Sequence, residues 1–277
     1  MLGRAVADAL AEAGVDVTPV GRAELDLARP ETIEAAISVD SRGYDWVFNC
    51  AAYTDVDGAE DDAGLADAIN GYGVGALAER CAAVDATLIH YGTDYVFDGA
   101  GTAPYPVDRP LNPVNAYGRS KALGERLLRE SGVRHLHLRT SWLYAPWGNN
   151  FVLTMARLTR DKDRLTVVDD QRGRPTSCRH LARATLELLD AGAQGTLHVT
   201  DGGECTWYDL ARVVRDAVGH ECEIVPCSSA EYPRRAPRPA YSVLDLSLAE
   251  AIIGPMAPFE KAVARALDAV PDSGEAS

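Results

Sequence analysis

The first half of the chain alternates short apolar segments with segments of helical periodicity. Continuous apolar runs, typical of strands buried on both faces of a parallel sheet, occupy residues 46–52, 87–93 and 135–141. Helices are predicted between them, at residues 31–38, 65–83 and 116–130. Strand and helix in regular succession predict a doubly wound, Rossmann-type parallel α/β sheet with helices on both faces.

The chain begins on a helical pattern that no strand precedes. Leu2, Val6 and Leu10 recur at helical spacing, Gly14 follows as a helix stop, and residues 15–20 alternate as a short strand. In a Rossmann unit a strand and two further glycines come before the first helix, where the pyrophosphate of the cofactor binds. We therefore expect Met1 to be an internal methionine of a protein that starts roughly ten residues upstream, with the first strand and most of the glycine loop absent from this chain.

The pattern of predicted elements changes after about Trp147. Helical patterns persist at residues 150–158, 179–189 and 207–218, whereas the strands shorten and the loops carry more proline and arginine. The stretch 232–245 is too rich in proline to form a long helix. We expect a dinucleotide-binding domain at 1–147 and a smaller, mainly substrate-binding lobe at 148–277, with some segments returning to the first sheet. Residues 271–277 are predicted to be a frayed tail.

Composition narrows the class of protein. Hydrophobic residues make up 47% of the chain and charged residues 25%, as in an ordinary globular protein. The net charge of −14 disfavours nucleic acid and anionic membranes as partners. No run is apolar enough to span a membrane, so a cytoplasmic location is expected. The six cysteines are scattered without a CxxC pair, which predicts reduced thiols and no metal site.

The sharpest chemical signal is the sequence YGRSK at residues 117–121. Tyr117 and Lys121 are four residues apart on one face of a predicted helix. An ammonium one turn away would lower the pKa of a tyrosine from about 10 towards neutrality and make it a proton donor. Thr93 ends a preceding strand, where its hydroxyl could polarise a substrate carbonyl. Taken alone, each of these residues also fits an ordinary surface or strand-end position.

Several motifs in order resemble one family over essentially the whole chain: LDLARPETI, NCAAYTDVDGAE, IHYGTDYVFDG, NPVNAYGRSKALGE, RTSWLYAPWGNNF, VVDDQRGRPT, TWYDLA and RPAYSVLD. They resemble the extended short-chain dehydrogenase/reductases, and more closely the dTDP-4-dehydrorhamnose reductases. The resemblance implies transfer of a hydride from NADPH or NADH to the C4 keto group of a dTDP-4-dehydro-6-deoxysugar, which yields dTDP-L-rhamnose.

The same resemblance implies roles for individual residues. Tyr117 would protonate the nascent alkoxide, Lys121 would lower the pKa of Tyr117 and hold the nicotinamide ribose, and Thr93 would polarise the ketone. The other implied cofactor contacts are Gly3, Asp26, Leu27, Ala51, Ala52, Tyr53 and Tyr91. The other implied substrate contacts are Asp94, Trp142, Gln171 and Arg238, the last two at the nucleotide-diphosphate end. Arg22 follows a predicted strand, where a cation would favour the 2′-phosphate of NADPH.

Alternatives remain open at this point. One is a 4-ketoreductase for another deoxysugar nucleotide, because stereochemistry depends on the shape of the pocket. Another is a non-catalytic, NADP-binding regulatory subunit, which the presence of Thr93, Tyr117 and Lys121 disfavours. A dehydratase is disfavoured because Asp94-Tyr95 stands where an Asp-Glu pair is expected. The resemblance also allows a homodimer and a magnesium ion at a subunit contact, for which the sequence names no ligands.

Overall fold

The computed structural model describes residues 1–38 and 43–270. Its principal sheet is parallel, with the order β1-β2-β3-β8. The strands are β1 (Trp46–Asn49), β2 (Thr87–Thr93), β3 (His135–Thr140) and β8 (Gly195–His198). Three of these strands confirm the apolar runs of the sequence, although β1 ends earlier than predicted.

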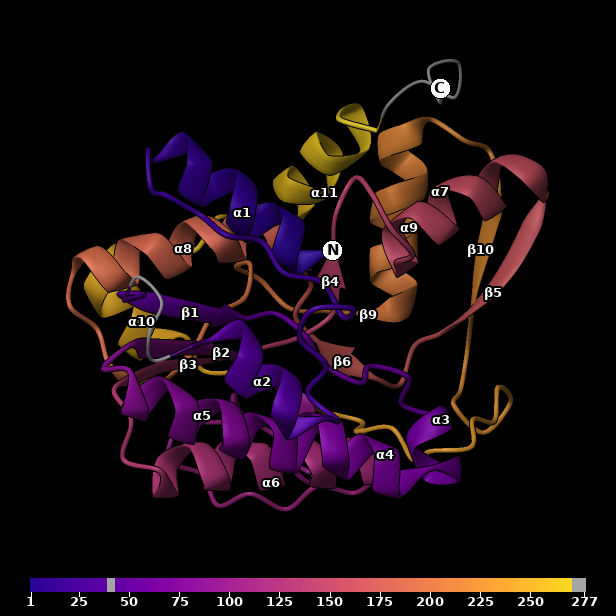
Figure 1. The fold of residues 1–277 in the computed structure, drawn as a ribbon. Coiled ribbons are helices and arrows are strands. Elements are labelled where there is room, and N and C mark those ends of the chain that lie inside the picture. The colour runs from indigo at the N-terminus through magenta and orange to yellow at the C-terminus, as the bar shows by residue number, and fades with distance from the viewer. Residues whose placement is uncertain (39–42, 271–277) are drawn as a thin grey trace.

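Helices cover both faces of this sheet (Figure 1). On one face lie α1 (Leu2–Glu12), α8 (Cys178–Asp190) and α10 (Ser247–Ile253); on the other lie α2 (Pro30–Ala36), α5 (Gly73–Ala83) and α6 (Ala116–Glu130). Side chains of β2 alternate between the two cores: Ile89 and Tyr91 pack with α1 and α8, whereas Leu88 packs with α5 and α6. The prediction of a doubly wound parallel sheet is confirmed.

A second group of elements is built mainly from residues after 143. Its helices are α7 (Phe151–Asp161), α9 (Trp207–Val218) and α11 (Phe259–Asp268). A parallel pair of strands, β5 (Arg164–Val168) and β10 (Glu223–Cys227), lies beside them (Figure 1). Short strands complete this part: β4 (Leu143–Tyr144) with β7 (Thr176–Ser177), and β6 (Arg172–Gly173) with β9 (Cys205–Thr206). Because β8 is a strand of the first sheet and α8 packs against that sheet, the chain returns to it after residue 148. The boundary near 147 stays a prediction.

Two predicted elements differ in the structure. Residues 15–20 are not a strand: their one backbone hydrogen bond within the described part of the chain joins Val15 N to Leu10 O, so no ladder forms. The predicted helix 65–83 is interrupted, as α4 (Ala63–Asp67), a π-helical turn η1 (Ala68–Tyr72) and α5. Such turns recur at functional sites, and this one carries the buried Asn70.

Short elements fill the ends of the sheet. They are α3 (Gly58–Asp61), after β1, and η2 (Asp94–Val96), directly after β2. The stretch 232–245 contains no helix among the described residues, as its prolines predict. None of the helices in the described ranges is both long and apolar enough to cross a membrane. Residues 271–277, predicted to be a tail, lie outside the described part of the chain.

Candidate active site

Helix α6 begins beside the carboxyl end of β2 and presents the predicted catalytic pair. Asn115 caps it: its side-chain oxygen accepts a hydrogen bond from Gly118 N at 2.7 Å. A Cβ at Gly118 would lie 2.2 Å from the carbonyl oxygen of Tyr95, so only glycine lets the helix approach η2 this closely. Tyr117 therefore lies next to Tyr95, with ring centroids 5.7 Å apart in an edge-on arrangement.

The Tyr117 phenol is in its protonated form. Burial raises its pKa to about 12; a side-chain hydrogen bond from Thr93 acts in the opposite direction, and the charge of Asp94 adds to the rise. Lys121 is not among the causes of this shift, so its expected lowering of the Tyr117 pKa stays a prediction. A neutral phenol beside a threonine hydroxyl still suits proton donation to an alkoxide.

Lys121 is buried beneath Tyr117, one turn further along α6. Its Nζ donates a hydrogen bond to the backbone oxygen of Tyr91 at 2.8 Å. Burial lowers its pKa to about 8, and the carboxylate of Glu125 partly opposes this. Glu125 in turn forms a buried bidentate ion pair with Arg139 on β3. Lys121, the predicted catalytic lysine, is therefore held by a backbone hydrogen bond and lies near a buried pair of opposite charges.

Thr93 and Asp94 close the end of β2. The Thr93 hydroxyl donates to Asp94 Oδ1 at 3.0 Å and accepts from Tyr95 N at 3.2 Å. Asp94 is buried, and burial raises its pKa to about 6 in spite of the hydroxyls of Ser242 and Thr93 nearby. Its Oδ2 has no hydrogen-bond partner in the described residues. When Asp94 is protonated, its Oδ1 is a weaker acceptor for the Thr93 hydroxyl. The Thr93 hydroxyl can then donate its hydrogen bond to a substrate oxygen instead.

Two tryptophans and a glutamine form a wall in the second part of the molecule. Trp142 adopts a left-handed φ of 47° and stacks on Trp207 at 3.6 Å. Gly173 makes room for it, since a Cβ there would lie 2.8 Å from the indole. Gln171 accepts from Trp207 Nε1 at 3.2 Å and donates to Ser229 Oγ at 2.7 Å, so its amide braces this wall. TWYDLA is one of the motifs that carry the resemblance, but no role for Trp207 was predicted from it.

The predicted cofactor side lies around the N-terminal end of α1. This end has no side-chain cap, so its backbone N–H groups are available to an anion, and Gly3 approaches Cys50 just beyond β1. Ala51 is exposed and Ala52 and Tyr53 are half-buried beside it. These features fit the pyrophosphate of a dinucleotide.

Two buried polar residues for which no role was predicted, Asn70 and Ser120, join the predicted cofactor side to helix α6. Asn70, in the π-helical turn, accepts from Tyr53 N at 2.8 Å and donates to Tyr53 O at 2.9 Å. It also donates to Ser120 Oγ at 3.0 Å, next to Lys121. The available signal was an asparagine within an apolar helical run. Its effect is to join the predicted cofactor loop to α6.

Asp26, Leu27 and Arg22 lie near the far end of that side. Asp26 accepts from Ala28 N at 3.0 Å, and Arg22 lies 3.4 Å from its carboxylate with its own side chain 75% exposed. The Leu27 side chain is buried against α5, where Gly73 leaves space for its backbone oxygen. The side chain of Leu27 therefore faces the core, and its contact with an adenine stays a prediction.

The Tyr91 ring is buried, and its contact with the nicotinamide stays a prediction. It is buried with Ile89 on the strand face that packs against α8, and its hydroxyl lies 3.2 Å from Thr185 Oγ1. The alternation of β2 accounts for this, since Tyr91 shares the parity of Ile89. The contribution of Tyr91 to the site is its backbone oxygen, which holds Lys121.

The suggested magnesium site has no support. Among residues 1–38 and 43–270 no group of three or more His, Cys, Asp or Glu side chains could hold a metal ion. The acidic side chains near the site are already engaged, for example Asp57, which accepts from Ala236 N at 3.0 Å and Arg238 at 3.0 Å.

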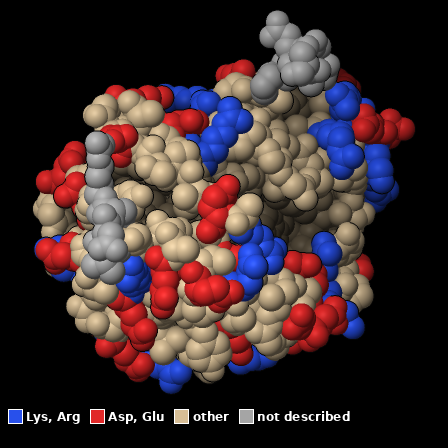
Figure 2. All heavy atoms as spheres, viewed as in Figure 1, with Lys and Arg blue, Asp and Glu red and all other residues tan. Residues whose placement is uncertain are grey.

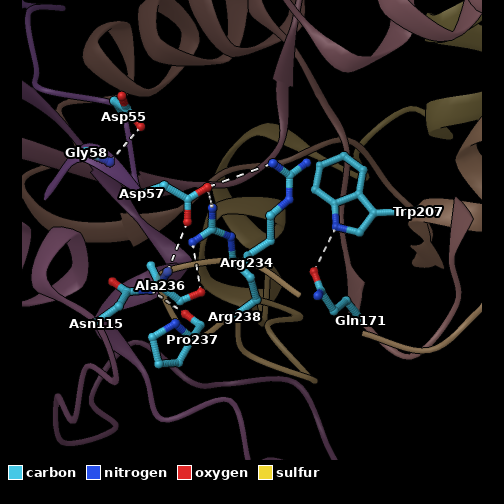
Figure 3. Close-up of polar contacts among 10 residues, drawn as sticks. All are labelled: Asp55, Asp57, Gly58, Asn115, Gln171, Trp207, Arg234, Ala236, Pro237 and Arg238. Atoms are coloured by element: carbon cyan, nitrogen blue, oxygen red, sulfur yellow. Dashed lines mark hydrogen bonds and ion pairs between the residues drawn. The ribbon is translucent and has the colours of Figure 1, made fainter. Parts of the chain in front are cut away.

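The predicted substrate residue Arg238 lies on the proline-rich stretch. Figure 3 shows Arg234 and Arg238 directed at Asp57, with Trp207 and Gln171 across the same space. The face shown in Figure 2 is hollowed near its centre, between the parallel sheet and the second part of the molecule. A separate groove of about 560 Å³ lies along the outer side of α6, and its lining includes none of the predicted site residues.

The parallel sheet, with Thr93, Tyr117 and Lys121 at one of its ends, defines an extended short-chain dehydrogenase/reductase. The family described as "RmlD substrate binding domain" matches residues 1–271. The dTDP-4-dehydrorhamnose reductase of Mycolicibacterium smegmatis is 40% identical over 98% of this chain and 83% of its own length. This protein therefore belongs to the dTDP-4-dehydrorhamnose reductase family.

Two further relatives bear on cofactor and substrate. The dTDP-4-dehydrorhamnose reductase of Bacillus anthracis, solved in complex with NADP, superposes with a TM-score of 0.91 at 32% identity, over 96% of this chain and 95% of that one. A protein of Streptomyces antibioticus, named as a probable dTDP-4,6-dihydroxy-2-methyloxan-3-one 4-ketoreductase, is 41% identical over 88% of this chain and 83% of its own length.

Proposed function

We propose that this protein reduces the C4 keto group of dTDP-4-dehydrorhamnose to a hydroxyl and releases dTDP-L-rhamnose, with NADPH as the hydride donor. The carrying observation is that Thr93, Tyr117 and Lys121 meet at one end of the sheet, with Tyr117 neutral and Lys121 fixed in place. The dTDP-4-dehydrorhamnose reductases at about 40% identity support the substrate. The NADP complex of the Bacillus anthracis relative and the exposed Arg22 support NADPH over NADH.

The reaction needs one hydride and one proton. Bound NADPH would supply the hydride to C4, and the N-terminal end of α1, Gly3 and residues 51–53 would hold it. The Thr93 hydroxyl donates a hydrogen bond to the ketone oxygen, and the Tyr117 hydroxyl transfers its proton to that oxygen as C4 accepts the hydride. The positive charge of Lys121, whose pKa of about 8 keeps it mainly protonated at neutral pH, stabilises the phenolate that remains.

The stacked Trp142 and Trp207 form an apolar wall suited to the deoxysugar. The residues do not define the stereochemistry at C4. The 4-ketoreductase activity for which the Streptomyces antibioticus relative is named is therefore a second candidate function. The regulatory alternative is disfavoured because the proton-donating set is complete.

The test is oxidation of NADPH and of NADH by the purified protein with dTDP-4-dehydrorhamnose, and identification of the sugar product by NMR. Tyr117→Phe removes the proton donor and should lower kcat by about 10²- to 10⁴-fold without weakening NADPH binding. Tyr95→Phe is the matched control, since it removes a neighbouring phenol and should cost far less. Equal losses in the two variants, or turnover of a different 4-keto sugar alone, would reject the proposal.

A further inference from the structure

A proline-rich segment from the second part of the molecule crosses to the first. This segment, residues 233–238, is named the strap here; it lies between β10 and α10 and contains neither helix nor strand. Its backbone is fixed at two points: Ala236 N donates to Asp57 at 3.0 Å, and Pro237 O accepts from Asn115 Nδ2 at 2.8 Å. Asn115 is the residue that caps α6, so the strap is attached next to the helix turn that carries Tyr117.

The three arginines of the strap differ in what they contact. Arg238 is 16% exposed and donates to Asp57 at 3.0 Å and to Ala236 O at 3.2 Å. Arg235 forms an ion pair with Asp61 of α3. Both guanidinium groups therefore serve to attach the strap to the first part of the molecule.

Arg234 is the exception. It is 53% exposed, and its nearest carboxylate, Asp57, lies 3.9 Å away, beyond hydrogen-bonding distance. Its guanidinium also lies 4.9 Å from the centre of the Tyr232 ring, which orients it without using its N–H groups. A guanidinium has five N–H donors, so most of the donors of Arg234 remain available to a ligand.

The position of Arg234 relates it to the site. Figure 3 shows its guanidinium between Asp57 and the Trp207–Gln171 wall. Arg238, which shares Asp57 with it, is close enough to Tyr95 to lower the pKa of that phenol against the dominant effect of burial. Tyr95 in turn contacts Tyr117. A ligand that reaches from Tyr117 along this wall therefore passes Arg234.

Charge favours an anion at this point. Arg234 and Arg238 carry two positive charges against the single carboxylate of Asp57, in a protein whose net charge is −14. A planar guanidinium matches two phosphate oxygens at once. Resting on the proposed function, we propose that Arg234, rather than Arg238, binds the diphosphate of the sugar nucleotide, and that Asp57, Arg238 and Asn115 hold the strap that presents it.

The test compares Arg234→Gln with Arg235→Gln, which removes the same charge from the adjacent residue of the same strap. The dissociation constant of dTDP, measured by calorimetry, should rise by about 10- to 100-fold in Arg234→Gln, as expected for the loss of charge-assisted hydrogen bonds. Arg235→Gln should change it by less than about 3-fold, because its partner is an exposed carboxylate. The affinities for thymidine and for NADPH should not change in either variant.

Turnover provides a second readout. Arg234→Gln should raise KM for the sugar nucleotide with little change in kcat, since the diphosphate contact is the same in substrate and transition state. Equal losses in the two variants would overturn the proposal and point to net charge alone, and a loss confined to NADPH would place Arg234 at the cofactor. If the wild-type protein does not reduce the sugar but the dTDP result holds, the proposed function fails and the diphosphate site stands.

Discussion

The inner face of α6 carries two of the predicted catalytic residues, and the strap carries the proposed ligand-binding arginine. Different forces hold these two regions in place. On α6, Lys121 and Glu125 are buried, and Arg139 of β3 pairs with Glu125 at 2% exposure. On the strap, Arg234 and Arg235 are more than half exposed, and their carboxylate partners are Asp57 and Asp61. The comparison teaches that the predicted proton-transfer residues are buried in the folded core, whereas the proposed ligand-binding arginine is itself exposed, on a segment that other residues hold in place.

The largest effect on stability should come from the buried charges under α6. Arg139→Met leaves the Glu125 carboxylate without its main partner and the Val107 carbonyl without a donor. The free energy of unfolding should fall by about 3–5 kcal/mol, because an unpaired charge remains in the interior. Urea denaturation measures it.

Arg129→Met is the matched control, because Arg129 approaches the same carboxylate at 4.0 Å but is 52% exposed. Its loss should lower the free energy of unfolding by less than about 1 kcal/mol. A similar fall in both variants would show that burial does not distinguish the two contacts.

The sequence predicted α6 to the residue and β2 likewise, because helical and strand periodicity are local properties. The position of Tyr117 above Lys121 followed from spacing alone. The pKa of Tyr117 did not, since desolvation depends on what surrounds the ring: Tyr95, Thr93 and Asp94 come from another element. Asn70 was missed for the same reason, as its two partner residues, Tyr53 and Ser120, lie 17 and 50 residues away.

Asp94 should give a pH-dependent effect of intermediate size. Its folded-state pKa of about 6 is above the model-peptide value of 3.8, so the native state binds more protons between these pH values and stability falls as pH rises through them. Asp94→Asn removes this penalty. At pH 7 the variant should be more stable than wild type by up to about 3 kcal/mol, and the difference should vanish below pH ~4.

Asp98→Asn is a control of opposite sign on the same segment. Hydrogen bonds from the Tyr105 hydroxyl and Ala100 N hold the pKa of Asp98 below its usual value. Its native-state stabilisation is therefore present at neutral pH and is lost as pH falls through the folded pKa. From pH 4 to 7 the difference between Asp94→Asn and wild type should grow, whereas the difference between Asp98→Asn and wild type should stay nearly constant and shrink only below the ordinary pKa of 3.8. Parallel curves for the two variants would contradict the assignment to Asp94.

The strap could be recognised in the sequence only as a stretch that is not helical. Its contacts join residues 234–238 to Asp57, Asp61 and Asn115, and no periodicity links positions so far apart. The resemblance nominated Arg238 because it stands in the RPAYS motif. In the structure Arg238 contacts Asp57 and Ala236 O, and its substrate contact stays a prediction. Under our proposal, membership of the motif indicates the binding segment but does not distinguish among its arginines.

The smallest effect on folding should come from Arg234. Because its approach to Asp57 is 3.9 Å and half in solvent, Arg234→Gln should change the free energy of unfolding by less than about 0.5 kcal/mol. Arg238→Gln should cost more, about 1–2 kcal/mol, because it removes a part-buried, charge-assisted hydrogen bond and a second bond to Ala236 O. Urea denaturation of both variants, set beside their affinities for dTDP, separates anchoring from binding. If Arg234→Gln destabilises the protein as much as Arg238→Gln does, Arg234 is a further residue that holds the strap in place. The proposed division between anchoring and ligand-binding arginines would then not hold.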